Sequence, residues 1–150
     1  MDDPLRLDRQ ICFPLYAATN LLTRLYRPVL AEIGLTYSQY LVMLVLWEQA
    51  PQSVSALGAR LHLDSGTLTP LLKRMEAAGL VTRQRDPSDE RRVQIALTER
   101  GNALRVPARR VPETMLAGMA FDPAEGDAFR GAVQGLVDVL AKRLDGAGED

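Results

Sequence analysis

A mostly α-helical fold with one small β-hairpin is predicted by two features of the 150-residue sequence. Over most of the chain, apolar residues recur at spacings of three, four and seven, the period of a helix with one buried face. Between residues 80 and 97 the period changes to two, as in strands on either side of a polar turn. We predict a single domain over residues 1–150, because domains usually hold about 100 to 200 residues.

The first helix is predicted to start near Pro14, which suits a first helical turn because its missing N–H would have no partner there. Cys12, the only cysteine of the chain, would then lie at the helix N-terminus or one residue before it. Pro28 removes one backbone hydrogen bond, so a bend is expected near residues 26–28. The apolar stripe of this helix comprises Leu15, Leu22, Leu25, Val29 and Ile33.

Polar residues mark the starts of the next two helices. Thr36 and Gln39 have the spacing of a capping box, and the helix that follows should run through Trp47 and be buried on most sides. Ser53 can cap a short helix over residues 54–61, because its hydroxyl can accept a hydrogen bond from the first turn.

A fourth helix is predicted from the turn Asp64-Ser65-Gly66 to Gly79, since glycine is favoured just after a helix C-terminus. Its inward stripe comprises Leu68, Leu71, Leu72 and Met75. Its opposite face is small at the N-terminal end and basic at the C-terminal end, which suits close approach to a polyanion. That face holds Gly66, Thr69, Pro70, Lys73 and Arg74.

Beyond Gly79, alternation of residue types predicts a β-hairpin. Its charged tip is residues 86–90, and its returning strand is residues 92–97. Thr98 can then cap another helix, by the same hydroxyl chemistry as Ser53.

The C-terminal third is predicted to be helical, with interruptions. Pro107 and Pro112 should bend or divide the helix that starts at Thr98. A last helix should follow Asp122-Pro123 and run to about Leu144, and residues 145–150 should fray. Its apolar stripe comprises Phe129, Val133, Leu136, Val137, Leu140 and Leu144.

The order helix, helix, helix, hairpin over residues 37–98 predicts a winged helix-turn-helix. Helices on either side of this segment lie in residues 7–35 and 105–144, and each has an apolar stripe. A chain of this length has few residues left that could cover these stripes. We therefore expect the flanking helices to pair with those of a second copy through a two-fold interface, forming a homodimer.

Composition excludes several classes of protein. The longest uncharged run falls short of the roughly 20 apolar residues of a membrane span, and the first residues are acidic where a signal peptide is basic, so a cytoplasmic protein without membrane contact is expected. One cysteine excludes an intrachain disulfide and a cysteine-rich zinc site. His62 has no second ligand four residues on, so neither metal nor cofactor is predicted. The net charge is −1, but residues 53–98 are net basic, which favours a nucleic-acid partner.

Several segments resemble one known family. At the wing, Asp89-x-Arg91 followed by Leu97-Thr98-x-x-Gly101 resembles the signature of MarR-family transcriptional regulators. Residues 63–76 resemble the recognition helix of OhrR, the branch of that family that senses organic hydroperoxides, and residues 7–16 resemble the stretch that holds its sensing cysteine. Tyr26-Arg27-Pro28 and residues 35–40 resemble its tyrosine positions. The resemblance covers about residues 7–105 and implies a dimeric repressor rather than an enzyme.

For sensing, the resemblance implies that organic hydroperoxide oxidises Cys12. The thiolate is the reactive form of a cysteine, and the N–H groups of a helix N-terminus favour negative charge. The branch's tyrosines hydrogen-bond the sensing sulfur across the dimer, which here implies Tyr26 and Tyr37, with Tyr16 as a further candidate and Tyr40 unassigned between core and pocket.

The absence of a second cysteine implies the one-cysteine type of this branch. In that type a small cellular thiol forms a mixed disulfide with oxidised Cys12, and the change at the dimer interface releases the operator. Pro14 departs from the apolar residue expected in the sensing turn.

For operator DNA, the resemblance implies that the helix beginning at Ser65 enters the major groove of the double strand. Arg91 of the wing would enter the minor groove, where negative potential is concentrated, with Asp89 orienting it. Near base edges we expect Ser65, Gly66, Thr67, Thr69 and Pro70, and on phosphates Lys73 and Arg74.

Three other functions stay open at this point. The chain could be a MarR-type repressor that responds to a small phenolic or aromatic ligand in the dimer pocket, with Cys12 a bystander, because a lone cysteine between apolar residues is most often an inert buried thiol. It could be a thiol peroxidase, although it lacks a resolving cysteine. It could also be a helical interaction protein without a DNA function.

Overall fold

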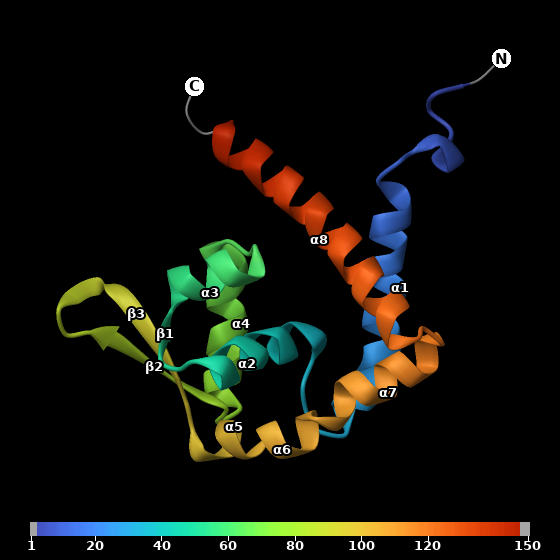
Figure 1. Ribbon diagram of the computed structural model, residues 1–150. Coiled ribbons are helices and arrows are strands. Elements are labelled where there is room, and N and C mark those ends of the chain that lie inside the picture. Colours follow the sequence, from blue (N-terminus) through green and yellow to red (C-terminus); the bar gives the residue numbers. More distant parts are fainter. Residues whose placement is uncertain (1–2, 148–150) are drawn as a thin grey trace. The chain divides into compact units, whose positions relative to one another are not determined.

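The computed structural model describes residues 3–147 (Figure 1). The chain divides between Pro112 and Glu113 into two compact units. The described elements are mostly helical with one small antiparallel sheet, so the predicted fold class is confirmed. In chain order they are the 3-10 turn η1 (Leu7–Arg9), α1 (Phe13–Ala31), α2 (Tyr37–Glu48), β1 (Gln52–Ser53), α3 (Val54–Leu61), α4 (Ser65–Ala77), β2 (Val81–Asp86), β3 (Asp89–Leu97), α5 (Glu99–Ala103), α6 (Arg105–Ala108), α7 (Arg110–Met119) and α8 (Pro123–Gly146).

The predicted caps define the starts of α2 and α4. The hydroxyl of Thr36 accepts from the Gln39 N–H at 3.3 Å, and the Gln39 side chain accepts from the Thr36 N–H at 3.0 Å, which is a complete capping box. Asp64 accepts from the Thr67 N–H at 2.7 Å and so begins α4. Gly79 follows α4 with φ +73°, a conformation that side-chain-bearing residues rarely adopt.

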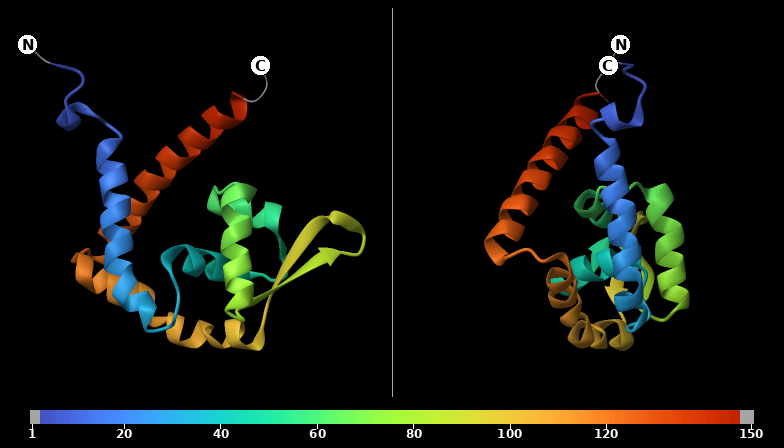
Figure 2. Two further views of the ribbon diagram at one scale, coloured as in Figure 1. Left: turned by 180° about the vertical axis from the view of Figure 1, so that it is seen from behind. Right: turned by 90° about the vertical axis from the view of Figure 1, so that its right-hand side faces the viewer.

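The sheet has one strand more than the sequence suggested. Its order is β1-β3-β2, all antiparallel, with Val81 opposite Leu97 in the hairpin and Gln52 opposite Ile95 at the other edge. β1 is only two residues long, which is too short to show alternation, and its Ser53 also caps α3. The left view in Figure 2 shows the hairpin extending beyond α3 and α4.

The core of the first unit lies among α2, α3, α4 and the inner face of the sheet. It is closed at the exit of the wing by the segment Thr98 to Gly101. The Thr98 hydroxyl donates to the Gly79 carbonyl at 2.6 Å, and the Trp47 indole donates to the Gly101 carbonyl at 3.0 Å. Any Cβ at position 101 would collide with the Leu80 carbonyl, so only glycine fits. Fully buried side chains include Met43, Leu46, Leu57, Leu68, Leu72, Met75 and Ile95.

Two prolines of the first unit divide helices as expected, and a third lies inside a helix. Pro107 and Pro112 each follow a helix end by four residues, at Ala103 and Ala108, because a proline ring clashes with the carbonyl of the fourth residue before it. The predicted division is thus confirmed. Pro28 does not end α1, which continues to Ala31: so close to the C-terminus its ring costs one hydrogen bond.

In the second unit, Asp122 forms a capping box with Glu125 and starts α8, as predicted for this helix. The helix continues through Asp145 and Gly146, so fraying does not begin at residue 145, while residues 148–150 of that prediction lie outside the described residues. The predicted apolar stripe is largely exposed, with Leu140 at 50% and Leu144 at 76%. None of the helices in residues 3–147 has the length and apolar character of a membrane span.

Candidate sensing site and nucleic-acid interface

Cys12 is the N-cap residue of α1, as the position of Pro14 predicted. Its carbonyl accepts from the Tyr16 N–H at 3.3 Å, but its side chain makes no capping hydrogen bond. The thiol is exposed, and so are the neighbouring Ile11 and Phe13. The structure therefore presents an accessible sulfur beside unpaired helix N–H groups, in apolar surroundings.

Tyr26 of α1 and Tyr37 of α2 form a packed aromatic pair with ring centroids 4.7 Å apart. Tyr40 joins the same cluster at 6.2 Å from Tyr26, a contact that the sequence left unassigned. Burial raises the pKa of all three phenols, and in Tyr26 and Tyr40 the neighbouring phenols raise it further. The three hydroxyls thus stay protonated at neutral pH and are available as hydrogen-bond donors.

Cys12 and the tyrosine pair lie at opposite ends of α1. Tyr26 follows Cys12 by fourteen positions, which corresponds to about 21 Å at the helical rise of 1.5 Å per residue. Tyr16, one turn beyond Cys12, is 67% exposed. One chain therefore brings Tyr26 and Tyr37 together but does not bring its own Cys12 to them.

The outward face of α4 is formed by the residues that the sequence assigned to DNA. Leu68, Leu71, Leu72 and Met75 are buried against the core. Thr69 is partly exposed, and the remaining candidates are exposed: Ser65, Gly66, Thr67, Pro70, Lys73 and Arg74. The helix thus presents small polar groups followed by two cations to solvent.

The wing tip is held by carboxylates that accept from nearby backbone groups. Asp89 accepts from the Arg91 N–H at 3.0 Å, so it orders the backbone of Arg91 rather than its guanidinium. Asp86 accepts from both the N–H and the hydroxyl of Ser88, and these bonds lower the pKa of its carboxyl. Arg91 is exposed, and it makes no ion pair within residues 3–147.

A cleft of about 300 Å³ separates the N-terminal end of α4 from the wing. Besides three predicted residues, Ser65, Thr69 and Arg91, it is lined by Arg83 and Arg92, which sequence reasoning did not single out. Arg83 could have been found from its position two residues after the buried Val81, because alternation places both on the inner face of β2.

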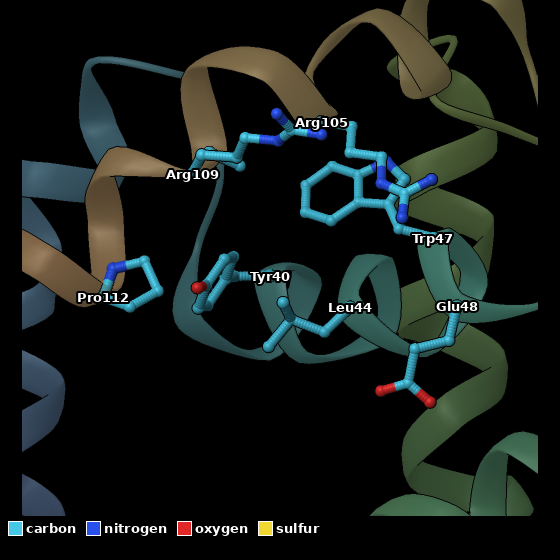
Figure 3. Close-up of a pocket in the computed structure, with 8 residues that line it drawn as sticks. Tyr40, Leu44, Trp47, Glu48, Arg105, Arg109 and Pro112 are labelled. Atoms are coloured by element: carbon cyan, nitrogen blue, oxygen red, sulfur yellow. The ribbon is translucent and has the colours of Figure 1, made fainter.

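A second hollow of about 360 Å³ lies where α2 meets α6 (Figure 3). Tyr40, Leu44 and Trp47 of α2 form one wall, and Arg105 and Arg109 project from α6 and its C-terminal cap on the other side. The hollow combines aromatic surface with two cations and with the carboxylate of Glu48. Among the described residues, no group of three His, Cys, Asp or Glu side chains is placed to hold a metal ion.

An exposed helix beside a basic hairpin, both carried by a compact helical core, defines a winged-helix DNA-binding protein of the transcription-regulator class. A family described as "Transcriptional regulator SarA/Rot" matches residues 24–105. The chain is 49% identical over 94% of its length to the organic hydroperoxide resistance transcriptional regulator of Bacillus subtilis, and covers 96% of that protein. The chain belongs to this family of MarR-type transcriptional regulators, in its OhrR-like branch.

Two further comparisons agree with this assignment. The regulator TtmR of Methylorubrum extorquens is 54% identical over 81% of the chain, and the match spans 63% of TtmR's own length. The structure of reduced AbfR bound to DNA is similar at a TM-score of 0.79, with 35% identity over 93% of this chain and 96% of that one. A crystal structure of MarR is similar at a TM-score of 0.67 with 25% identity, over 86% of this chain and 98% of that one.

Proposed function

We propose that the protein is a dimeric transcriptional repressor that releases operator DNA when organic hydroperoxide oxidises Cys12. The observation that carries the proposal is the accessible Cys12 thiol at the N-cap of α1, set among exposed apolar side chains. Such a thiol is placed to react as a thiolate, and its apolar neighbours suit an organic peroxide better than a hydrophilic one.

The dimer in this proposal completes the sensing site. Tyr26, with Tyr37 packed against it, lies about 21 Å along α1 from Cys12 of the same chain, so the two phenols would meet the Cys12 of the partner. Two O–H donors facing that sulfur would stabilise its anion, with Tyr16 a further candidate donor. The exposed apolar stripes of residues 7–35 and 105–144 supply the surface for such a pairing.

The redox step would proceed in two stages. The Cys12 thiolate attacks the peroxide, a sulfur–oxygen bond forms as the oxygen–oxygen bond breaks, and the alcohol leaves after taking a proton; sulfur is oxidised by two electrons to sulfenic acid. A small cellular thiol then forms a disulfide with that sulfur, and water leaves. A bulky adduct at the dimer interface would shift the spacing of the two α4 helices.

For DNA, α4 would enter the major groove with Ser65, Gly66, Thr67, Thr69 and Pro70 near base edges, and Lys73 and Arg74 on phosphates. Arg91 would enter the minor groove. The backbone hydrogen bond from Arg91 to Asp89 supports a fixed wing tip at that place. In related proteins the DNA-bound form exists in both redox states, as reduced and as overoxidized AbfR.

The decisive experiment replaces Cys12 by Ser and measures operator binding before and after cumene hydroperoxide with a small thiol. We expect the wild-type protein to gain the mass of the mixed disulfide and lose the operator, whereas Cys12→Ser keeps its operator through the same treatment. Tyr26→Phe and Tyr37→Phe should slow oxidation without lowering affinity for DNA. Release of DNA from the Cys12→Ser protein would reject the thiol mechanism.

A second candidate function is supported by the hollow between α2 and α6. It would take a small phenolic or aromatic anion against Tyr40 and Trp47, with Arg105 and Arg109 as counter-ions. In that case the ligand alone would release the operator, Cys12→Ser would respond as the wild type does, and Arg109→Gln would abolish the response.

We further propose that the protein acts in the cytoplasm, without a cofactor and without catalytic turnover. A repressor of this kind consumes about one peroxide per chain. Consumption of many equivalents of peroxide in excess thiol would instead indicate a peroxidase.

A further inference from the structure

The cleft between α4 and the wing combines three arginines with hydroxyl groups and has no acidic side chain among its lining residues. The hydroxyls belong to Ser65 and Thr69 of α4, to Ser55 of α3 and to Ser53 of β1. A concave surface of this composition attracts an anion and offers it several donors at once.

Arg83 is the unusual member of the cleft. It stands opposite the fully buried Ile95 on the inner face of the hairpin, and its side chain is only 21% exposed. Its Nε–H is buried without a hydrogen-bond partner. Buried donors are nearly always paired in folded proteins, so this guanidinium has hydrogen-bonding capacity that the chain itself does not fill.

Glu76 holds Arg83 only loosely. The carboxylate accepts from the Arg83 backbone N–H at 3.1 Å, but its distance to Nη1 is 3.9 Å, the long limit of an ion pair. A third hollow of about 250 Å³, lined by Glu76, Arg83, Arg85 and Val93, lies beside the same side chain. Arg83 therefore lines this hollow as well as the cleft, and its guanidinium is not held by a short ion pair.

The position of the cleft identifies the anion. The major groove of DNA is separated from the next minor groove by one sugar–phosphate backbone. A protein that places α4 in the first groove and Arg91 in the second must pass this backbone between α4 and the wing tip, which is where the cleft lies. Guanidinium groups match the geometry of phosphate oxygens.

We propose that this cleft binds one phosphate group of the DNA backbone, with Arg83 as its principal donor and Arg92 and Ser55 as its walls. The proposal rests on the proposed DNA-binding function and adds to it a contact outside the outward face of α4. The contact reads no sequence, so it sets the depth and register of α4 in the groove.

The test measures the affinity of the dimer for one duplex over a range of salt concentrations. We expect Arg83→Gln to lower affinity about ten- to a hundredfold at low salt. It should also reduce the slope of log affinity against log salt by about two, because the dimer loses one phosphate contact in each of its two clefts. Affinity for an unrelated duplex should fall by the same factor. Arg130→Gln on α8, where Arg130 pairs with Asp127, is the matched control and should change neither quantity.

Glu76→Gln separates a DNA contact from a purely structural ion pair. If Arg83 served only to pair with Glu76, both variants would weaken folding and DNA binding alike, and the proposal would be overturned. If the cleft holds a phosphate, Glu76→Gln leaves affinity unchanged or raises it. Thermal unfolding of each variant shows whether it is folded, and Arg83→Lys should restore the salt slope because it restores the charge.

Duplexes that carry a single neutral methylphosphonate locate the contact. One position for each subunit of the dimer should weaken binding by the wild type yet have no effect on Arg83→Gln. Equal losses for both proteins at every position would contradict the assignment, as would an unchanged salt slope in Arg83→Gln. Saturable binding of inorganic phosphate alone, with no effect of Arg83 on the salt slope, would instead indicate a site for free anions. If the wild-type protein shows no salt-dependent DNA binding, the proposed function itself is contradicted, whatever the role of the cleft.

Discussion

The winged-helix segment buries its apolar side chains, whereas the flanking helices leave many of theirs exposed. Within residues 37–98, Leu72 and Ile95 are fully buried by their own chain. On α8, Leu140 and Leu144 are at least half exposed, and so is Leu25 on α1. The contrast teaches that the winged-helix core is complete in one chain, whereas the flanking helices leave apolar surface that the proposed dimer would cover.

The largest effect is expected in the buried region. Leu72→Ala leaves a cavity in a core that one chain provides, so it should lower the free energy of unfolding by about 2 to 5 kcal/mol, as measured by urea denaturation. The same change at Leu140 should weaken stability mainly through the dimer, and its effect should grow as the protein is diluted. If both substitutions lowered the free energy of unfolding equally at every protein concentration, the proposed difference between the two regions would be contradicted.

The next largest effect is expected at the exposed stripe. Leu140→Asp would place an unpaired charge in the proposed seam and raise the dimer dissociation constant at least about a hundredfold, as followed by sedimentation. Lys142→Asp, on the opposite side of α8, should leave dimerisation unchanged. A Leu140→Asp protein that still sediments as a dimer would show that the seam lies elsewhere.

A smaller effect compares equivalent caps in the two regions. Asp64→Ala and Asp122→Ala each remove an N-cap carboxylate, from α4 and α8 respectively, and each should cost about 1 kcal/mol of stability. Only Asp64→Ala should also weaken DNA binding, because in the proposed complex only α4 enters the groove. Loss of DNA affinity in both variants would indicate an effect of stability alone.

The smallest effect concerns the tyrosine cluster and alkaline pH. Burial raises the pKa of Tyr37 in the folded chain above its ordinary value of 10.0. The contribution of protonated Tyr37 to the free energy of unfolding is therefore fully present below the ordinary pKa. It is lost as the pH rises through the higher pKa of Tyr37 in the folded chain. Urea unfolding at alkaline pH should show a shallower loss of stability for Tyr37→Phe than for the wild type, and an identical pH dependence would show that Tyr37 is not protected by burial.

Local chemistry made much of the fold predictable. Helix ends were predicted correctly from single residues. The starts of α2 and α4 are set by the capping side chains of Thr36, Gln39 and Asp64, and the backbone freedom of Gly79 suits the end of α4. β1 was missed because its pairing depends on β3, more than forty positions away. Pro28 lies inside α1 near its C-terminus, and the bend expected near residues 26–28 stays a prediction.

The site was predictable in its residues but not in its groupings. The position of Cys12 at the N-terminus of α1 follows from Pro14, and the outward face of α4 follows from helical period. The contact of Tyr40 with Tyr26 and the cleft around Arg83 depend on how separate elements pack, which periodicity does not encode. The roles assigned to these residues stay predictions until the variants above are measured.

The length of helix α1 between its cysteine and its tyrosines has a genetic consequence. In a dimer with shared sites, a chain bearing Cys12→Ser still lends its phenols to the other chain, and a chain bearing Tyr26→Phe and Tyr37→Phe still lends its thiol. A mixed dimer of the two therefore keeps one intact site and one doubly defective site. Cells that carry both alleles should regain part of a peroxide response that neither allele supports by itself.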